Sequence, residues 1–551
     1  MNKLLKQLAR ISSRLVPLFL FTMLAVMLLP NMLLAQESDN DYHERMKWWD
    51  EGRLGMFMHW GVYSTFGGEY KGEDYGKEMV GPSAEWIYFS TKYPQEDYKN
   101  AALNWNPEKF NAEEWVLMAK NAGMKYMVLT SKHHDGYALF DSKASDWNVV
   151  KTSAINRDLV KEYVDACHKH NMRVGFYYSH EKDWTHHKLH QEKLDGIPEK
   201  YVELVKQQIT ELFTQYGKID VIWFDMPNKE HEEFNKMCAG LVRKYQPECI
   251  INGRIGSGLG DYQNVKDRVI VDPGMAGYKE SIMTMRLNWG FDKNDDLWKS
   301  SNELIGMLSQ SACRGSNFLL NIGPKPDGTF PLEDQIRLRD LSEWMKVNGE
   351  AIYKTNGGPF LKDDRWGSLT QSKEADFIYL HLYSWTGGDI TVKGLKSRVE
   401  EASFLDTGEK LTFKQDKKKP VFTIDLPEIN SAKRLRIVKL KVDGKIFDTT
   451  KGPNFEAPKT HHLNHKSITG TITEINGVDF TISDDKLSLK KGNEINQTKS
   501  FTLNEKVRFR TNKNGDIRAV QSPEFNEGQK YRVVYIPYKE GDEVVIVTKI
   551  D

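Results

Sequence analysis

The chain has 551 residues, with 77 basic and 77 acidic side chains, so its formal charge at neutral pH is zero. This balance leaves no basic field to attract nucleic acid, and the sequence predicts no nucleic-acid partner. The length exceeds what a single hydrophobic core usually holds, so we expect several domains.

Residues 1–35 have the pattern of an export signal. Basic residues precede an apolar run from Leu15 to Leu34, and Ala35 stands before Gln36 as the cleavage residue. The run is long enough to span a membrane if it stays uncut, although prolines interrupt it. We expect an exported chain, periplasmic or extracellular, with no membrane segment after cleavage.

Residues 36–355 alternate strand and helix patterns, which predicts a (β/α)8-like TIM barrel as the catalytic domain. The predicted strands are Gly55–Trp60, Tyr126–Thr130, Arg173–Ser179, Val221–Asp225, Cys249–Gly253, Val269–Asp272, Ser281–Met285 and Phe318–Gly323. The predicted helices are Ala112–Ala122, Arg157–His170, Tyr201–Tyr216 and His231–Tyr245.

Beyond residue 355 the pattern changes to short strands separated by turns. We expect an antiparallel β-sandwich over 356–450, a linker over 451–466 and a small β-rich domain of unknown role over 467–551. The predicted strands of the sandwich are Phe377–Tyr383, Asp389–Val392, Val399–Phe404, Val421–Ile424 and Leu435–Val442. The fold class is therefore α/β plus β.

Four cysteines, Cys167, Cys238, Cys249 and Cys313, lie far apart and show no CxxC spacing. That spacing does not favour a metal site, and small buried apolar side chains are the simpler interpretation. One disulfide remains open in an oxidising compartment. No cofactor is expected.

The most informative stretch runs from Ile219 to Phe224. It is rich in β-branched and aromatic residues without alternation, which is typical of a strand buried on both faces. Asp225 follows where this strand ends, and the carboxyl ends of barrel strands are where such enzymes do their chemistry. A helix cap or an ion-pair partner is the competing interpretation of this carboxylate.

Other predicted strands end in polar or aromatic residues in the same way. They include His59, His133-His134, Tyr178 and Arg254. Several such ends on successive strands predict one polar rim around a single pocket. A metal-dependent hydrolase is the alternative, but adjacent histidines diverge on a strand and no HExxH motif is present, so no metal is expected.

Six segments together resemble the α-L-fucosidases of glycoside hydrolase family 29, over roughly the first two-thirds of the mature chain. They are Met58-His59-Trp60-Gly61-Val62-Tyr63-Ser64, Glu85-Trp86, Lys132-His133-His134-Asp135-Gly136, Tyr177-Tyr178-Ser179, Trp223-Phe224-Asp225 and Asn321-Ile322-Gly323-Pro324.

The resemblance implies an exo-acting enzyme that removes terminal α-L-fucose from oligosaccharides or polysaccharides with retention of configuration. It implies Asp225 as nucleophile and Glu280 as acid/base, with Glu85 and Glu69 as the next acid/base candidates. The residues expected to bind the sugar are His59, Glu85, Trp86, His133, His134, Tyr178, Trp223, Arg254 and Trp289. Tyr177 remains the alternative to Tyr178, because neighbours on a strand point in opposite directions.

Two departures from the family pattern bear on substrate preference. Lys279 stands where tryptophan is common, and Met226-Pro227 replaces the usual glycine after the nucleophile. A retaining glycosidase for a related sugar such as α-L-galactose, and a non-catalytic sugar-binding relative, are therefore kept as alternatives.

Overall fold

The computed structural model describes residues 38–76, 83–91, 95–186, 196–228, 230–358, 366–383, 388–395, 397–416, 420–427, 435–444, 466–476, 479–484, 498–502, 508–513, 516–520, 530–538 and 541–550. The predicted export signal lies outside these ranges. So does the predicted linker, except for its last residue, Lys466.

Eight parallel strands form one sheet in the order β7-β6-β5-β4-β1-β10-β9-β8. A single parallel bridge between Asn252 and Tyr262 connects its two edges, so the sheet curls into the predicted TIM-like barrel. The strands are β1 (Leu54–Met58), β4 (Tyr126–Lys132), β5 (Arg173–Ser179), β6 (Val221–Asp225), β7 (Ile250–Ile251), β8 (Gln263–Asn264), β9 (Lys279–Thr284) and β10 (Asn317–Ile322).

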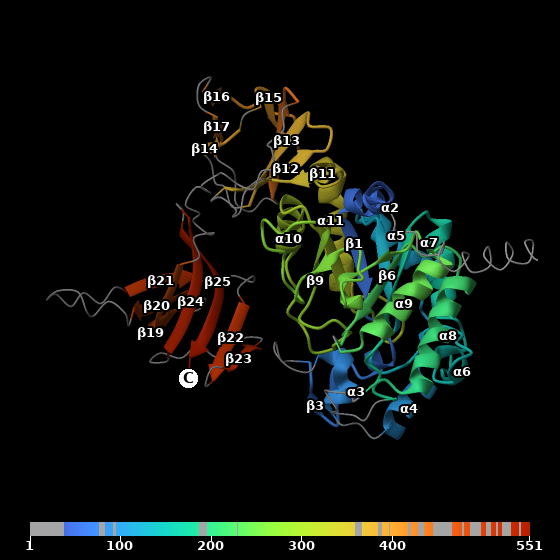
Figure 1. Ribbon diagram of the computed structural model, residues 1–551. Coiled ribbons are helices and arrows are strands. Elements are labelled where there is room, and N and C mark those ends of the chain that lie inside the picture. Colours follow the sequence, from blue (N-terminus) through green and yellow to red (C-terminus); the bar gives the residue numbers. More distant parts are fainter. Residues whose placement is uncertain are drawn as a thin grey trace, which may run out of the picture. The chain divides into compact units, whose positions relative to one another are not determined.

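Helices connect these strands on the outer side of the sheet (Figure 1). The long ones are α5 (Ala112–Asn121), α7 (Leu159–Lys169), α8 (Glu199–Gln215), α9 (Glu232–Tyr245), α10 (Ser301–Cys313) and α11 (Leu332–Asn348). Local sequence explains where several begin. Asn111 and Asp158 accept backbone hydrogen bonds at the starts of α5 and α7, and Ser300 forms a capping box with Glu303 at the start of α10.

This part of the chain contains further helices and two short strands. They are α2 (Asp39–Gly52), η2 (Val62–Thr65), β2 (Glu69–Tyr70), β3 (Glu73–Asp74), η3 (Ala84–Trp86), α3 (Ile87–Ser90), α4 (Gln95–Asn104), α6 (Val149–Thr152), η4 (Gly253–Ile255) and η5 (Gly349–Ala351).

One predicted barrel strand is wrong. Val269–Asp272 is not a strand of the sheet, since Val269 is exposed and makes only an isolated antiparallel bridge with Ile282. The polar pair Gln263-Asn264 forms β8 instead. Two polar residues carry no hydrophobic pattern, so this strand gave no signal in the sequence.

The sandwich consists of a five-stranded sheet, β11-β12-β13-β18-β15, and a three-stranded sheet, β14-β17-β16, around a separate apolar core. All of its described strand pairs are antiparallel, as predicted. Its strands are β11 (Thr355–Gly357), β12 (Gly367–Ser372), β13 (Phe377–Leu382), β14 (Gly388–Lys393), β15 (Val399–Phe404), β16 (Phe413–Gln415), β17 (Val421–Leu426) and β18 (Arg436–Val442).

The C-terminal part of the chain forms one further seven-stranded sheet, in the order β21-β20-β19-β24-β25-β22-β23. Its strands are β19 (Lys466–Asn476), β20 (Asp479–Asp484), β21 (Thr498–Thr502), β22 (Arg508–Lys513), β23 (Asp516–Val520), β24 (Lys530–Tyr538) and β25 (Gly541–Ile550). Only β22 and β25 pair in parallel. The predicted β-rich character of this region is confirmed.

The end of β6 is fixed by its neighbour. The Asn252 side chain accepts a hydrogen bond from the Phe224 amide at 2.7 Å and donates one to the Phe224 carbonyl at 2.9 Å. Every residue of β6 is buried, so the strand has no freedom to shift. Asp225, the next residue, is therefore held in a defined position at the carboxyl end of the sheet.

Candidate active site

Asp225 is only 9% exposed and has three polar partners. The Tyr177 hydroxyl donates to its Oδ2 at 3.0 Å, Arg254 donates to its Oδ1 at 3.2 Å, and His134 Nε2 lies 3.8 Å from its Oδ2. Burial alone would raise the pKa of this carboxyl, but Arg254, His134 and the Tyr177 hydrogen bond outweigh it and hold the pKa below its usual value. Asp225 is therefore an anion at neutral pH.

Three histidines stand near this carboxylate and are neutral. Burial lowers the pKa of His59 to about 4 and that of His134 to about 3, and it lowers the pKa of His133 well below its usual value. The Tyr177 ring stacks on His133, with centroids 5.4 Å apart. Neutral imidazoles offer one donor and one acceptor each, which suits hydroxyl groups better than charged ligands.

The side-chain amide of Asn321 hydrogen bonds to two residues on the His59 side of the site. A hydrogen bond of 2.7 Å joins Asn321 Oδ1 to His59 Nδ1, and Asn321 Nδ2 donates to the Trp289 carbonyl at 2.7 Å. Glu85 closes this side, since its Oε2 accepts from the Gly290 amide at 3.0 Å. Burial raises the pKa of Glu85, although its hydrogen bonds act against the rise.

These side chains line one cavity. It is lined by Phe57, His59, Glu85, Trp86, His133, His134, Tyr177, Trp223, Asp225, Met226, Arg254, Asp267, Ile282 and Trp289. Eight of the nine residues predicted to bind the sugar are in this lining, together with Asp225. A polar cavity with aromatic walls and one buried anion offers partners for both the hydroxyl groups and the C–H faces of a sugar.

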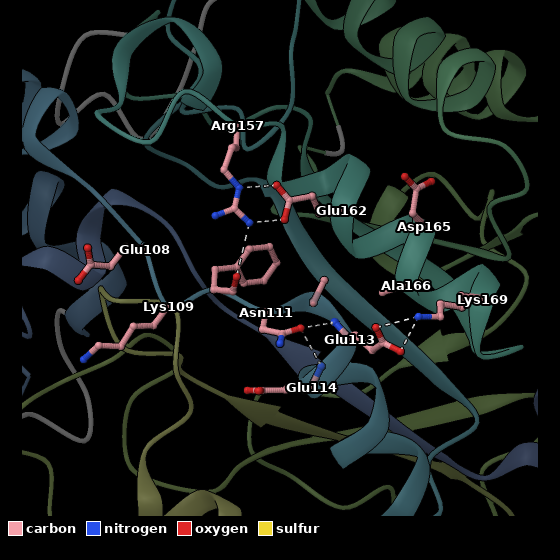
Figure 2. Close-up of a pocket in the computed structure, with 12 residues that line it drawn as sticks. Glu108, Lys109, Asn111, Glu113, Glu114, Arg157, Glu162, Asp165, Ala166 and Lys169 are labelled. Carbon is pink, nitrogen blue, oxygen red and sulfur yellow. Dashed lines mark hydrogen bonds and ion pairs between the residues drawn. The ribbon is translucent and has the colours of Figure 1, made fainter.

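A larger hollow of about 650 Å³ lies between α5 and α7 (Figure 2), and it shares no lining residue with this cavity. Some of its charged groups are paired with one another. Arg157 binds Glu162, and Lys169 lies 2.7 Å from Glu113. Since no carboxylate of this lining is buried, we do not assign the chemistry to this surface.

Tyr178 is the exception among the predicted sugar-binding residues. It points to the other side of β5, packs in the hydrophobic core and donates a hydrogen bond to Gln208 at 2.7 Å. Tyr177 takes the place expected of it in the cavity. The sequence identified the strand end but not which of the two neighbouring residues faces inward.

Glu280 also differs from expectation, because it does not line the cavity. It lies near the amino end of β9, opposite Asn317, the first residue of β10. Its carboxyl accepts hydrogen bonds from the Tyr126 hydroxyl at 2.6 Å and from Trp223 Nε1 at 3.0 Å, and Asn264 donates at 3.1 Å. Glu280 therefore lies behind Trp223 and outside the cavity lining, and its pairing with Asp225 as acid/base stays a prediction.

The environment of Glu280 predicts a pH-dependent stability. Burial raises the pKa of Glu280 from 4.5 to about 7, so the folded chain keeps a proton that the unfolded chain releases. This contribution is fully present below about pH 4.5 and is lost as pH rises through about 7, a loss on the order of 3 kcal/mol. We expect Glu280→Gln to gain stability relative to the wild type between about pH 5 and pH 8. The melting temperatures of the wild type and of Glu280→Gln, measured at both pH values, test this prediction. An equal change in melting temperature between the two pH values in both proteins would contradict it.

Asp267 and Met226 are cavity residues that the sequence did not assign to the sugar site. Asp267 follows β8, and its carboxylate accepts a hydrogen bond from Arg254 Nη2, while Nη1 of the same guanidinium binds Asp225. Because β8 was not recognised, the residue after it could not be recognised as a strand end. Asp267 belongs to the polar rim by the same rule that identified Asp225.

No group of three or more histidine, cysteine or acidic side chains in the described ranges is arranged to hold a metal ion. None of the four cysteines forms a disulfide, and all four are buried. Among the described helices, none has the length and apolar character needed to cross a membrane.

A family model described as alpha-L-fucosidase matches residues 30–350. The plasma alpha-L-fucosidase of Rattus norvegicus is 29% identical over 411 residues, covering 70% of this chain and 87% of that protein. The plasma alpha-L-fucosidase of Homo sapiens is 30% identical over 376 residues, covering 64% and 79%.

Two solved structures share the fold. Alpha-L-fucosidase isoenzyme 1 from Paenibacillus thiaminolyticus has a TM-score of 0.64 and 27% identity, covering 73% of this chain and 99% of that one. A glycoside hydrolase family 29 alpha-L-fucosidase from Bacteroides thetaiotaomicron has a TM-score of 0.65 and 29% identity, covering 72% and 96%. That protein was captured as a covalent intermediate with 2-fluoro-fucosyl fluoride in a glutamate-to-glutamine mutant.

Proposed function

Because the chain belongs to the alpha-L-fucosidase family, we propose that it hydrolyses terminal α-L-fucosyl residues of oligosaccharides or polysaccharides with retention of configuration. The observation that carries the proposal is the ionised Asp225 at the carboxyl end of β6, buried in a cavity lined by neutral histidines and aromatic side chains. A cavity closed at its inner end suits an exo-acting enzyme, since only a terminal unit can enter it.

In the proposed reaction the Asp225 carboxylate attacks the anomeric carbon, and the bond to the leaving-group oxygen breaks. A covalent glycosyl-enzyme results, and water then attacks the same carbon, so two inversions give overall retention. The three neutral histidines line the cavity, and in this proposal they hydrogen bond the ring hydroxyls. Such contacts accelerate the reaction to the extent that they strengthen as positive charge develops on the ring.

For the acid/base we propose Asp267. Arg254 binds Asp225 through Nη1 and Asp267 through Nη2, so one guanidinium joins two carboxylates at the cavity, and a retaining mechanism requires two carboxyl groups. The Asp267 side chain is 44% exposed, which suits a group that must meet the departing oxygen and then water. Glu280 is kept as the alternative, because the intermediate of the Bacteroides relative was captured in a glutamate variant.

The experiment for the overall proposal is a panel of aryl glycosides. We expect turnover of the α-L-fucoside with initial release of α-L-fucose, detected by NMR of the fresh product. Faster turnover of the α-L-galactoside would favour the related sugar, and binding of fucose without turnover would favour a sugar-binding relative. Loss of activity on treatment with a chelator, restored by added metal, would support the metal-dependent alternative.

We further propose that the mature chain begins near Gln36, outside the cytoplasm. The support is the basic start, the apolar run to Leu34 and the Ala35-Gln36 junction. N-terminal sequencing of the protein purified from its native host should give a sequence that starts at or close to Gln36. Recovery of intact Met1 in the cytoplasmic fraction would contradict export.

A further inference from the structure

Met226 follows the proposed nucleophile directly and lines the same cavity. Its backbone has φ of 55°, a left-handed conformation that costs a residue other than glycine free energy. Its side chain is apolar and yet 41% exposed. A strained backbone and an exposed apolar side chain both oppose stability, so their combination beside the reacting atoms suggests a functional role.

The surrounding chain holds Met226 in this conformation. Pro227 packs so closely on Gly256 that a β-carbon at Gly256 would lie 2.8 Å from the proline ring. One residue later, the Asn228 amide donates to Glu181 Oε1 at 2.8 Å, and Asn235 Nδ2 donates to the Asn228 carbonyl at 3.4 Å. Because these contacts hold both residues that follow Met226, the backbone of Met226 keeps its conformation and its thioether lines the cavity.

Burial along the cavity wall separates its inner end from its mouth. His59, Glu85 and His133 are almost fully buried, whereas Met226 and Asp267 are exposed and Trp86 is partly exposed. A terminal sugar bound among the buried residues leaves its glycosidic oxygen directed toward the exposed ones. The mouth is therefore where the leaving group is held.

We propose that Met226 is a specificity-determining residue that binds the sugar from which the fucosyl unit is cleaved. This inference rests on the proposed function. The thioether, with Trp86 at the same mouth, offers an apolar and polarisable surface to the C–H face of a neutral pyranose. Met226 would then discriminate between leaving groups without taking part in the chemistry on the fucosyl ring.

The test compares two substrates that share the fucosyl unit. α-L-Fucosyl fluoride has a one-atom leaving group and cannot reach the methionine, whereas a fucosyl disaccharide places a pyranose at the mouth. For Met226→Ala we expect the ratio of kcat/KM for the disaccharide to kcat/KM for the fluoride to fall about tenfold. Met226→Leu should restore most of the ratio.

The Met226→Gly variant distinguishes the effect of losing the side chain from the effect of backbone strain. Glycine accepts φ of 55° without strain, so its melting temperature should be higher than that of Met226→Ala, while its substrate ratio should match that of Met226→Ala. Leu117→Ala removes an apolar side chain of similar exposure, 38%, from α5 outside the cavity, and should leave the ratio as in the wild type.

A ratio unaffected in Met226→Ala, or equal loss on both substrates, would overturn the specificity role while the proposed function stands. A ratio that falls in Met226→Ala but not in Met226→Gly would also overturn it, since backbone strain would then be the cause. A wild-type enzyme inactive on the fluoride would instead refute the proposed function, and this inference with it.

Discussion

Replacing Asp225 by alanine is expected to abolish turnover, lowering kcat by roughly 10⁴–10⁶-fold, the range found when a catalytic nucleophile or its partner is removed. Among the residues that the structure describes, no other carboxylate of the cavity is suited to form the glycosyl-enzyme, since Glu85 is buried against Gly290 and Asp267 stands at the mouth. Azide should restore part of the rate on an aryl fucoside by entering the space left by the carboxylate. The product should be a fucosyl azide of inverted configuration, because only one displacement occurs.

Asp220, which directly precedes β6, provides a matched control. It is also a buried carboxylate paired with an arginine, Arg173, at 2.7 Å, but it lies outside the cavity. Asp220→Ala should lower the melting temperature and leave kcat per folded molecule close to that of the wild type. If Asp225→Ala kept most of its activity, or if azide gave product of retained configuration, the nucleophile would have to be another residue.

The second large effect is expected for Asp267, and it should depend on the leaving group. Asp267→Ala should slow a fucosyl disaccharide by roughly 10²–10⁴-fold more than an aryl fucoside whose leaving group needs no proton. Azide should speed turnover of the activated aryl substrate by attacking the accumulated glycosyl-enzyme. Here the fucosyl azide should have retained configuration, the opposite of the Asp225 variant.

The Glu280→Gln variant decides whether Asp267 or Glu280 is the acid/base. If Glu280 acts only behind Trp223, as its hydrogen bond to the indole suggests, the variant should change both substrates by the same factor and azide should have no effect. A leaving-group dependence and azide rescue in Glu280→Gln, with neither in Asp267→Ala, would return the acid/base role to Glu280.

Much of the barrel could be predicted because its strands carry strong local signals. The apolar run before Asp225 has no alternation, which is typical of a strand buried on both faces, and it indicated both the element and the position of the carboxylate. Tyr177 and Tyr178 show the limit of this reasoning. Both are aromatic and both are buried, so the pattern could not tell which face of β5 each occupies.

The position of Glu280 outside the cavity lining was missed for a different reason. The family pattern directed attention to its neighbours in sequence, but the next strand was predicted to begin at Ser281, so Glu280 was already at an amino end. The rule that favoured Asp225 would have argued against it. Asp267 was missed for the converse reason, since β8 before it is a polar pair that only tertiary contacts define.

The amide of Asn321 has a consequence for which sugars the site accepts. Its Nδ2 donates to the Trp289 carbonyl, so its oxygen must face His59, and the proton of that neutral imidazole must therefore be on Nδ1. His59 Nε2 then carries a bare lone pair. A ligand must present a hydroxyl hydrogen to it, and an ether or fluorine in that position would leave two acceptors facing each other. A deoxy, methylated or fluorinated sugar at that hydroxyl should therefore be rejected strongly, by an amount that rises toward 10⁴-fold when the unpaired group stays buried.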